Sequence, residues 1–156
     1  MKLRLTVIVA VFFTFAIGSV RTALAAPPKD ACSLLTSAQV SSVLGFSAKP
    51  GRIISTDTTV CDWPVASLSK MTAKDTKEIE VKILDADSWA MIAPAASGAA
   101  QVKGIGDIAA YLGPPTLMTL YVKKGTTEFD VNVHGFPLDQ VKAKEKTLAQ
   151  DILAKL

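Results

Sequence analysis

The stretch from Lys77 to Asp85, KEIEVKILD, alternates apolar and charged side chains along most of its length and constrains the fold more than any other stretch. The apolar positions share one side of an extended chain and the charged positions share the other: Ile79, Val81 and Ile83 against Glu78, Glu80 and Lys82. Such a strand covers a core with one face and meets water with the other, which is typical of antiparallel sheets. The pattern therefore predicts a half-buried sheet.

Residues 116–135 repeat this alternation and predict a hairpin that turns at Lys124-Gly125. In its second arm the two sets of side chains are Phe129, Val131 and Val133 against Glu128, Asp130 and Asn132. Shorter strands are expected over residues 52–56, 58–63 and 107–113, with turns near Asp57 and at Gly113-Pro114-Pro115.

Helices are expected at both ends of this set of strands. Thr36 and Gln39 have capping-box spacing and Gly45 suits a helix end, which predicts a helix over Ser37–Leu44. Its inward residues are expected to be Val40, Val43 and Leu44. A long amphipathic helix is predicted over Leu138–Leu156, with Leu138, Val141, Leu148, Ile152 and Leu156 on its apolar side.

The segment between the strands also carries local signals. A helical turn capped by Asp87 is expected to stop at Pro94. The small, nearly uncharged residues from Pro94 to Gly106 predict a loop, which is either a binding surface or a mobile connection.

This order of elements lacks regular strand–helix–strand alternation, so the predicted class is α+β. We expect a mainly antiparallel sheet with a short N-terminal helix and a long C-terminal amphipathic helix packed on it. Residues 31–156 are expected to form a single domain, preceded by a short extended leader over residues 26–30.

The first 25 residues have the order of a secretory signal peptide: basic Lys2 and Arg4, an apolar run, and a small-residue cleavage site ending at Ala25. The apolar run of 13 residues, Leu5 to Ile17, is shorter than the roughly 20 that a spanning helix needs. We therefore expect export through the secretory pathway to the periplasm or the extracellular space, with no membrane span after cleavage.

Removal of this segment changes the charge of the chain. The full sequence has a formal net charge of +3, and Lys2, Arg4 and Arg21 leave with the signal, so the exported part is neutral. Arg52 is then its only arginine, and no basic cluster is interleaved with aromatic residues. Since nucleic-acid binding relies on Lys and Arg patches, a nucleic-acid partner is not expected.

Cys32 and Cys61 are the two cysteines of the chain, and both lie in the exported part. In an oxidising compartment they are expected to form a disulfide that ties the start of the first helix to the CDWP strand. Lipid attachment is disfavoured because Lys29-Asp30-Ala31 lacks the small and aliphatic residues that precede a lipidated cysteine. Nucleophilic catalysis would need a free thiolate and a neighbouring base.

The remaining candidate residues are few. His134 is the only histidine, so neither a zinc site nor a catalytic base with a defined partner is indicated. GIGDIA, residues 104–109, matches a dinucleotide fingerprint in spacing but lacks the required strand before and helix after it, so a tight turn is expected. Trp63, Trp89 and His134 are candidate surface or binding residues, Trp63 also being a packing anchor beside the disulfide. No cofactor, metal site or catalytic residue is predicted.

Four segments together resemble a functionally uncharacterised family: DACSLLTSAQVSSVLG, CDW, VKGIGDIAAYLG and LYVKKG. The chain is similar to small secreted bacterial domains of unknown function, akin to those of actinobacterial lipoproteins. The resemblance implies an α+β sandwich similar to the PsbP-like fold and a paired-cysteine core, and it supplies no catalytic residues.

The leading hypothesis is a non-enzymatic binding module of the bacterial envelope that binds a protein, a glycan or a small apolar ligand. One alternative is a hydrolase-like enzyme whose site assembles around His134 with Asp130 and Asp107. Another is a structural envelope component, which would expose a large apolar patch.

Overall fold

A computed structural model describes residues 28–65, 77–97, 99, 101–114 and 117–156. These residues form an antiparallel sheet with the strand order β1-β2-β3-β6-β5-β4. The strands are β1 (Arg52–Ile53), β2 (Val60–Pro64), β3 (Glu78–Ile83), β4 (Ile108–Leu112), β5 (Thr119–Lys124) and β6 (Thr127–His134). The predicted signal peptide, residues 1–25, lies outside the described residues.

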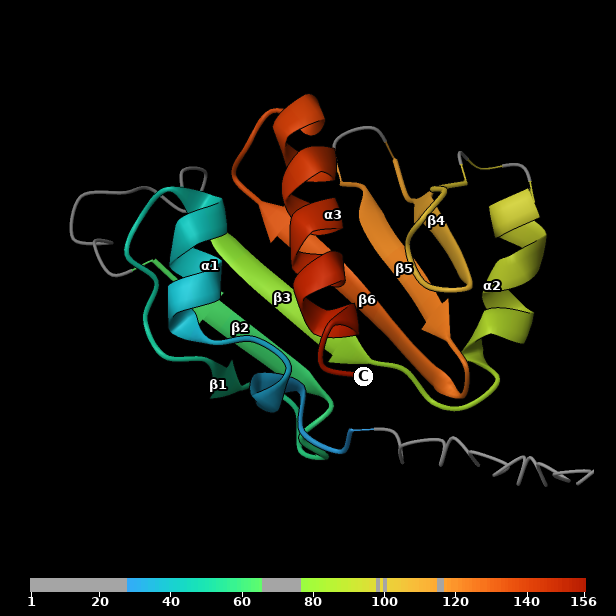
Figure 1. Cartoon of the computed structure of the whole chain (residues 1–156), viewed down its shortest axis with the longest axis horizontal. Helices are drawn as coiled ribbons and strands as arrows, with labels where there is room; N and C mark the ends of the chain where they lie inside the picture. The colour runs from blue at the N-terminus through green and yellow to red at the C-terminus, as the bar shows by residue number, and fades with distance from the viewer. Residues whose placement is uncertain (1–27, 66–76, 98, 100, 115–116) are drawn as a thin grey trace, which may run out of the picture.

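Helices α1 (Ser37–Leu44) and α3 (Leu138–Leu153) lie on one face of the sheet (Figure 1). Helix α2 (Ser88–Ser97) lies beside β4, at the other end of the molecule from α1 (Figure 1). The predicted α+β class, with a short N-terminal helix and a long C-terminal helix packed on an antiparallel sheet, is confirmed. Among the described residues, no helix is long and apolar enough to cross a bilayer.

The predicted α1 is confirmed from its first residue to its last. The Thr36 hydroxyl accepts the backbone N–H of Gln39 at 3.2 Å, while the Gln39 side chain accepts the Thr36 N–H at 3.0 Å. Gly45 ends the helix at φ 75°, where a side chain would be strained. Val40 and Leu44 are buried and Val43 packs against the core.

Helix α2 corrects two sequence predictions. The helix continues through Pro94 to Ser97, so the predicted loop over 94–106 begins later than expected. Asp87 does not cap it in the usual extended conformation, because its backbone is left-handed at φ 76°. The side chain of Glu128, from β6, instead accepts the Trp89 N–H at 2.6 Å. The Glu128 carboxylate therefore takes the place at the start of α2 that the sequence assigned to Asp87.

The later part of that predicted loop is ordered against the sheet. Gly104 and Gly106 both have positive φ, and a Cβ on Gly106 would lie 2.5 Å from the Lys123 carbonyl oxygen. Ile105, between them, is buried in the core. The tight-turn interpretation of GIGDIA is therefore confirmed, and the turn leads into a strand, β4.

Helix α3 ends at Leu153, three residues before the predicted end. Its buried face consists of Val141, Glu145, Leu148, Ala149 and Ile152. The apolar-stripe prediction missed Glu145, which is fully buried. Leu138, expected inside, is 37% exposed.

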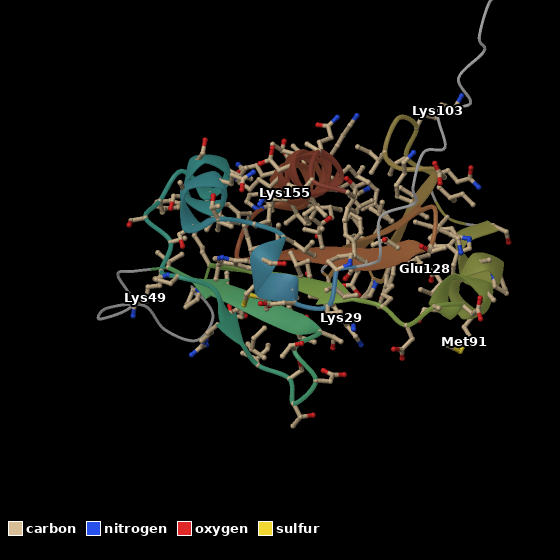
Figure 2. All side chains as sticks on the ribbon, turned by 60° about the horizontal axis from the view of Figure 1, so that its bottom comes forward. Lys29, Lys49, Met91, Lys103, Glu128 and Lys155 are labelled. Carbon is tan, nitrogen blue, oxygen red and sulfur yellow. A yellow bond between two sulfur atoms is a disulfide. The ribbon has the colours of Figure 1, made fainter. Side chains whose placement is uncertain are left out.

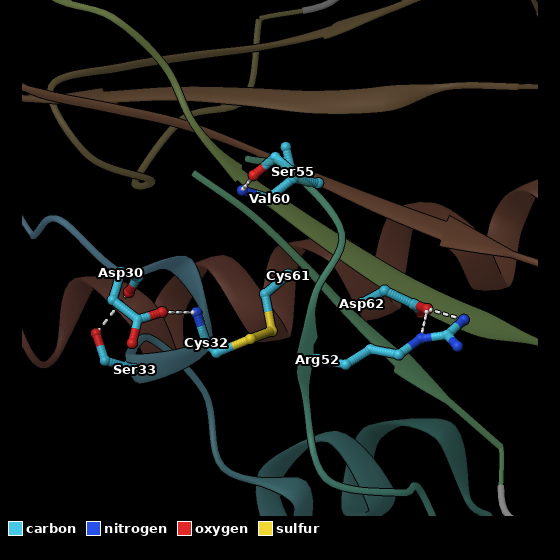
Figure 3. Close-up of a disulfide and its surroundings, with 8 residues drawn as sticks. All are labelled: Asp30, Cys32, Ser33, Arg52, Ser55, Val60, Cys61 and Asp62. Atoms are coloured by element: carbon cyan, nitrogen blue, oxygen red, sulfur yellow. Dashed lines mark hydrogen bonds and ion pairs between the residues drawn. A yellow bond between two sulfur atoms is a disulfide. The ribbon is translucent and has the colours of Figure 1, made fainter. Parts of the chain in front are cut away.

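The disulfide between Cys32 and Cys61 is present and joins the short 3-10 helix η1 (Ala31–Ser33) to β2 (Figure 3). Asp30 fixes the start of η1 by accepting the Cys32 N–H at 2.8 Å. The bridge therefore fastens the N-terminal segment of the domain to its sheet, and neither cysteine is free.

Candidate functional site

The strongest candidate site is a pocket of about 330 Å³ where β6 ends and α3 begins. Residues from both sides of this junction, and from the segment entering β5, line it: Leu117, Met118, Val133, His134, Gly135, Phe136, Leu138 and Val141. Another pocket is lined by residues 101–109 alone, and a third lies between the turn over residues 55–60 and the end of β3. Six of these eight residues are apolar, and polar atoms, His134 among them, contribute about as much of the wall as apolar atoms do, a mixture that suits a ligand with an apolar body and a polar end.

The chain turns sharply to build this pocket. Gly135, at φ 81°, follows the last residue of β6, and Pro137 then begins α3 without a side-chain cap. These residues bring the end of β6 and the first turn of α3 together around Phe136. The sequence GFP, read as a turn before a helix, is the signal that could have indicated a junction here.

Exposed apolar side chains surround the pocket. Leu117 is 47% exposed and Leu138 37% exposed, and both are lining residues. Phe46, 45% exposed, lies next to the lining residue Phe136, with 6.4 Å between their ring centroids. Three large apolar groups left in water at one junction favour a binding function for it.

Two lysines give the aromatic side of the pocket a positive charge. The Lys77 Nζ lies 4.4 Å from the Phe46 ring centroid and 5.1 Å from that of Phe136. The Lys144 Nζ lies 4.6 Å from the Phe136 ring centroid and donates to the Val43 carbonyl oxygen. These cation–π contacts hold ammonium groups beside an apolar surface.

A buried carboxyl group lies next to the pocket wall. Glu145 is one helical turn from the lining residue Val141, and its Oε1 accepts the N–H of Val133, another lining residue, at 3.2 Å. Val133 is near the end of β6, beyond the residues that β5 pairs, so Glu145 supplies the acceptor there. Burial, the largest effect, raises the pKa of Glu145 to about 8.

The predicted candidate residues are not brought together. Trp63 is 1% exposed on the core side of β2 and packs beside Cys61 and Gly51, so it is a packing residue rather than a surface one. Trp89 is half-buried at the start of α2, next to Glu128. His134 is half-buried at the opposite end of β6, where it lines the pocket.

The residues of the hydrolase-like alternative do not converge either. Asp130 and His134 are four residues apart on β6, a separation of about 13 Å along a strand. Asp107 lies at the other end of this strand, where it accepts the Gly125 N–H at 2.7 Å and pairs with Lys124. Within the described ranges, no three metal-ligating side chains gather as a metal site would require.

Most of the pocket-forming residues were missed in the sequence. Met118, Phe136 and the two lysines belong to separate segments, and only the chain path brings them together. Searches of family models, of curated proteins and of solved structures find no match to this chain.

Proposed function

We propose that the protein is an exported, non-enzymatic binding module of the bacterial envelope that holds a small apolar ligand with a carboxylate end. The observation that carries this proposal is the pocket between β6 and α3, with its exposed apolar rim. The signal-peptide pattern and the resemblance to small secreted bacterial domains support the location, and the disulfide is consistent with it.

The apolar walls select the body of the ligand. Leu117, Met118 and Leu138 present accessible aliphatic surface, and burial of each ligand methylene contributes about 0.8 kcal/mol. A linear alkyl chain is the simplest apolar ligand for a pocket between a strand end and a helix. Affinity should therefore rise with chain length until the pocket is full.

The polar groups select the end of the ligand. The His134 imidazole can donate or accept a hydrogen bond at the pocket wall. The Lys77 and Lys144 ammonium groups, both beside Phe136, favour a negative charge there. Asp139, exposed in the first turn of α3, is an acidic residue near the same junction, and its removal should strengthen carboxylate binding.

Calorimetric titration with octanoate, hexanoate and octanol tests this function. Octanoate should bind about ten-fold or more tightly than hexanoate, because octanoate buries two more methylenes in the pocket. Octanol should bind more weakly than octanoate, and the Lys77→Gln variant should reduce this difference. Lys155→Gln, at an exposed lysine near the C-terminus (Figure 2), is the matched control and should change neither affinity.

A variant that fills the pocket tests whether octanoate binds there. Leu138→Trp adds a large ring at the rim, on a side chain that is already 37% exposed, so the fold should tolerate it. It should abolish octanoate binding, whereas Met91→Trp, at a 79% exposed position of α2, should not. No octanoate binding by the wild-type protein, or equal binding by Leu138→Trp, would reject the proposed function.

A further inference from the structure

The sheet face opposite α1 and α3 carries a row of acceptor groups. Asp62 on β2, Glu80 on β3 and Asn132 on β6 lie directly opposite one another across the three strands. Their neighbours along β6, Val131 and Val133, are in the core cluster, so the row lies on the other face of the sheet. Opposite side chains in a sheet are close enough to bind one group together.

The next row continues the same surface. Asp130 on β6 lies between Lys82 on β3 and Tyr121 on β5. The Asp130 side chain is buried, with 7% of the residue exposed, and Tyr121 is half-buried beside it. A carboxyl group and an aromatic ring therefore adjoin the acceptor row at the centre of the sheet.

One oxygen of the row already has a cation, and a second cation of the face is paired outside the row. Arg52 pairs with Asp62 at 2.7 Å through Oδ2 (Figure 3), and Lys123 pairs with Glu128. Glu128 lies near α2 (Figure 2), two residues before Asp130 on β6. Lys82 is then left with the carboxyl groups of Glu78, Glu80 and Asp130, and no ion pair within the described residues joins it to any of them.

Buried oxygen atoms of the row lack a donor among the described residues. Asp62 is 4% exposed, and its Oδ1 has no hydrogen-bond partner. The Oδ1 of Asn132 is likewise buried and unpartnered, although this side chain carries no charge. Native structures pair nearly all such buried acceptors, so these two atoms leave hydrogen-bonding capacity of the row unused.

We propose that Asp62, Glu80, Asp130 and Asn132 form a binding site for a guanidinium group, presented by an arginine side chain of a partner protein. A guanidinium carries five N–H donors in one plane, is weakly hydrated, and stacks on aromatic rings such as that of Tyr121. An ammonium group is more strongly hydrated and offers no planar face. Asp130 is suited to this role because burial, and secondarily Glu80, raise its pKa to about 7 despite Lys82, and a bound cation would favour its charged form.

NMR titration of the whole exported protein with the capped peptide acetyl-Gly-Arg-Gly-amide tests this site. The peptide should shift the Asn132 side-chain amide and the Tyr121 signals, with dissociation in the millimolar range or tighter. The same peptide with citrulline, a neutral isostere of arginine, should bind at least ten-fold more weakly, and the lysine peptide should also be weaker. Equal binding of the citrulline peptide would overturn the proposal.

Variants and free arginine separate this site from non-specific charge attraction. Glu80→Gln, at a half-buried position, and Asp130→Asn should each lower the affinity for the arginine peptide at least five-fold. Asp151→Asn, which removes the same charge from α3, should leave the affinity unchanged, and an equal loss there would contradict the site. If Asp130→Asn does not fold, the affinity of the Glu80→Gln variant for the arginine peptide tests the site by itself.

Free arginine tests the source of the guanidinium. Free arginine offers the same guanidinium, its α-ammonium and α-carboxylate groups have opposite charges, and it lacks the peptide groups of a protein segment, so it should bind no more tightly than the capped peptide. Tighter binding of free arginine would overturn the assignment to a protein partner. Octanoate binding plays no part in these measurements, so this proposal and the pocket function can fail separately.

Discussion

At the scale of single residues, Glu145 is the least expected side chain of the core. It is fully buried on α3, with the Val133 N–H bonded to Oε1 and no hydrogen-bond partner for Oε2 among the described residues. Tyr111 and Lys142 lie in the same region, the Tyr111 hydroxyl donating to the Lys142 carbonyl oxygen at 2.6 Å. Burial accounts for most of the rise in the Tyr111 pKa to about 12, and the charge of Glu145 adds to it. The core therefore favours a neutral Glu145.

Glu145 makes the free energy of unfolding depend on pH. Its pKa is about 8 in the folded protein and near 4.5 in an unfolded chain, so between these values the folded state holds a proton that the unfolded state lacks. The stabilising contribution of this proton is complete below about pH 4.5 and is lost as pH rises to 8. Asp130, with its pKa raised to about 7, acts in the same direction.

The Glu145→Gln variant should flatten this dependence. Urea unfolding at several pH values should show that the wild-type protein loses stability between pH 5 and 8, on the order of a few kcal/mol. The variant should lose clearly less, since only Asp130 still contributes. Glu78→Gln, a matched change on a half-buried strand residue, should keep the wild-type slope. An unchanged slope in Glu145→Gln would show that this carboxyl group does not titrate as inferred.

At the scale of secondary-structure elements, α2 depends on a residue far away in sequence. Glu128 is 2% exposed, accepts the Trp89 N–H and pairs with Lys123, so one side chain links α2, β5 and β6. Met91, on the outer side of α2, is largely exposed (Figure 2), and Ala96 is the one residue of this helix in the buried class. The helix should therefore be stabilised to an unusual extent by its cap.

Glu128→Ala tests this dependence. Removal of a buried, paired carboxylate should lower the free energy of unfolding by about 3 kcal/mol. Hydrogen exchange should also accelerate at the first amides of α2, from Trp89 to Ile92, more than in α1 or α3. Asp107→Ala, which removes an exposed carboxylate that is also hydrogen-bonded near the β5–β6 turn, should cost much less. If exchange in α2 accelerates no more than in α1 and α3, other contacts stabilise the helix.

The elements that could be predicted from the sequence are those with local causes. The capping box and Gly45 fix α1, and the alternation in residues 77–85 fixes β3. Pro94 misled because a proline seven residues into a helix can be tolerated when the surrounding structure compensates for the lost hydrogen bond. Glu145 was missed although it falls on the helical spacing of Val141 and Leu148, because a charged residue is not expected in a core.

At the scale of the whole molecule, the disulfide joins the N-terminal segment to the sheet. The 29-residue separation of Cys32 and Cys61 closes a loop whose cross-linking stabilises the folded state by roughly 3 to 4 kcal/mol in the chain-entropy account. The Cys32→Ala/Cys61→Ala double variant should lose about this much in urea unfolding. The intact mass of the exported protein should lie two hydrogens below that of the reduced chain. Two titratable thiols in the native protein would contradict the bridge.

The candidate site could not be predicted because its residues come from separate segments that only the fold brings together. His134 was singled out as the only histidine, yet its surroundings come from the segment before β5, from α3 and from the region of α1. The rows of the opposite sheet face depend on strand order, which places β6 between β3 and β5. Alternation within a strand predicts which side chains share a face, but not which strands are neighbours.

The most direct test of the pocket function is a map of the contacts between octanoate and the protein, from intermolecular NOEs in isotope-filtered NMR spectra. The proposed function predicts NOEs from the alkyl chain to the methyl groups of Met118, Val133, Leu138 and Val141, and from the carboxylate end to the His134 or Phe136 ring. NOEs confined to another surface, such as the turn over residues 101–109, or none at saturating octanoate, would contradict it.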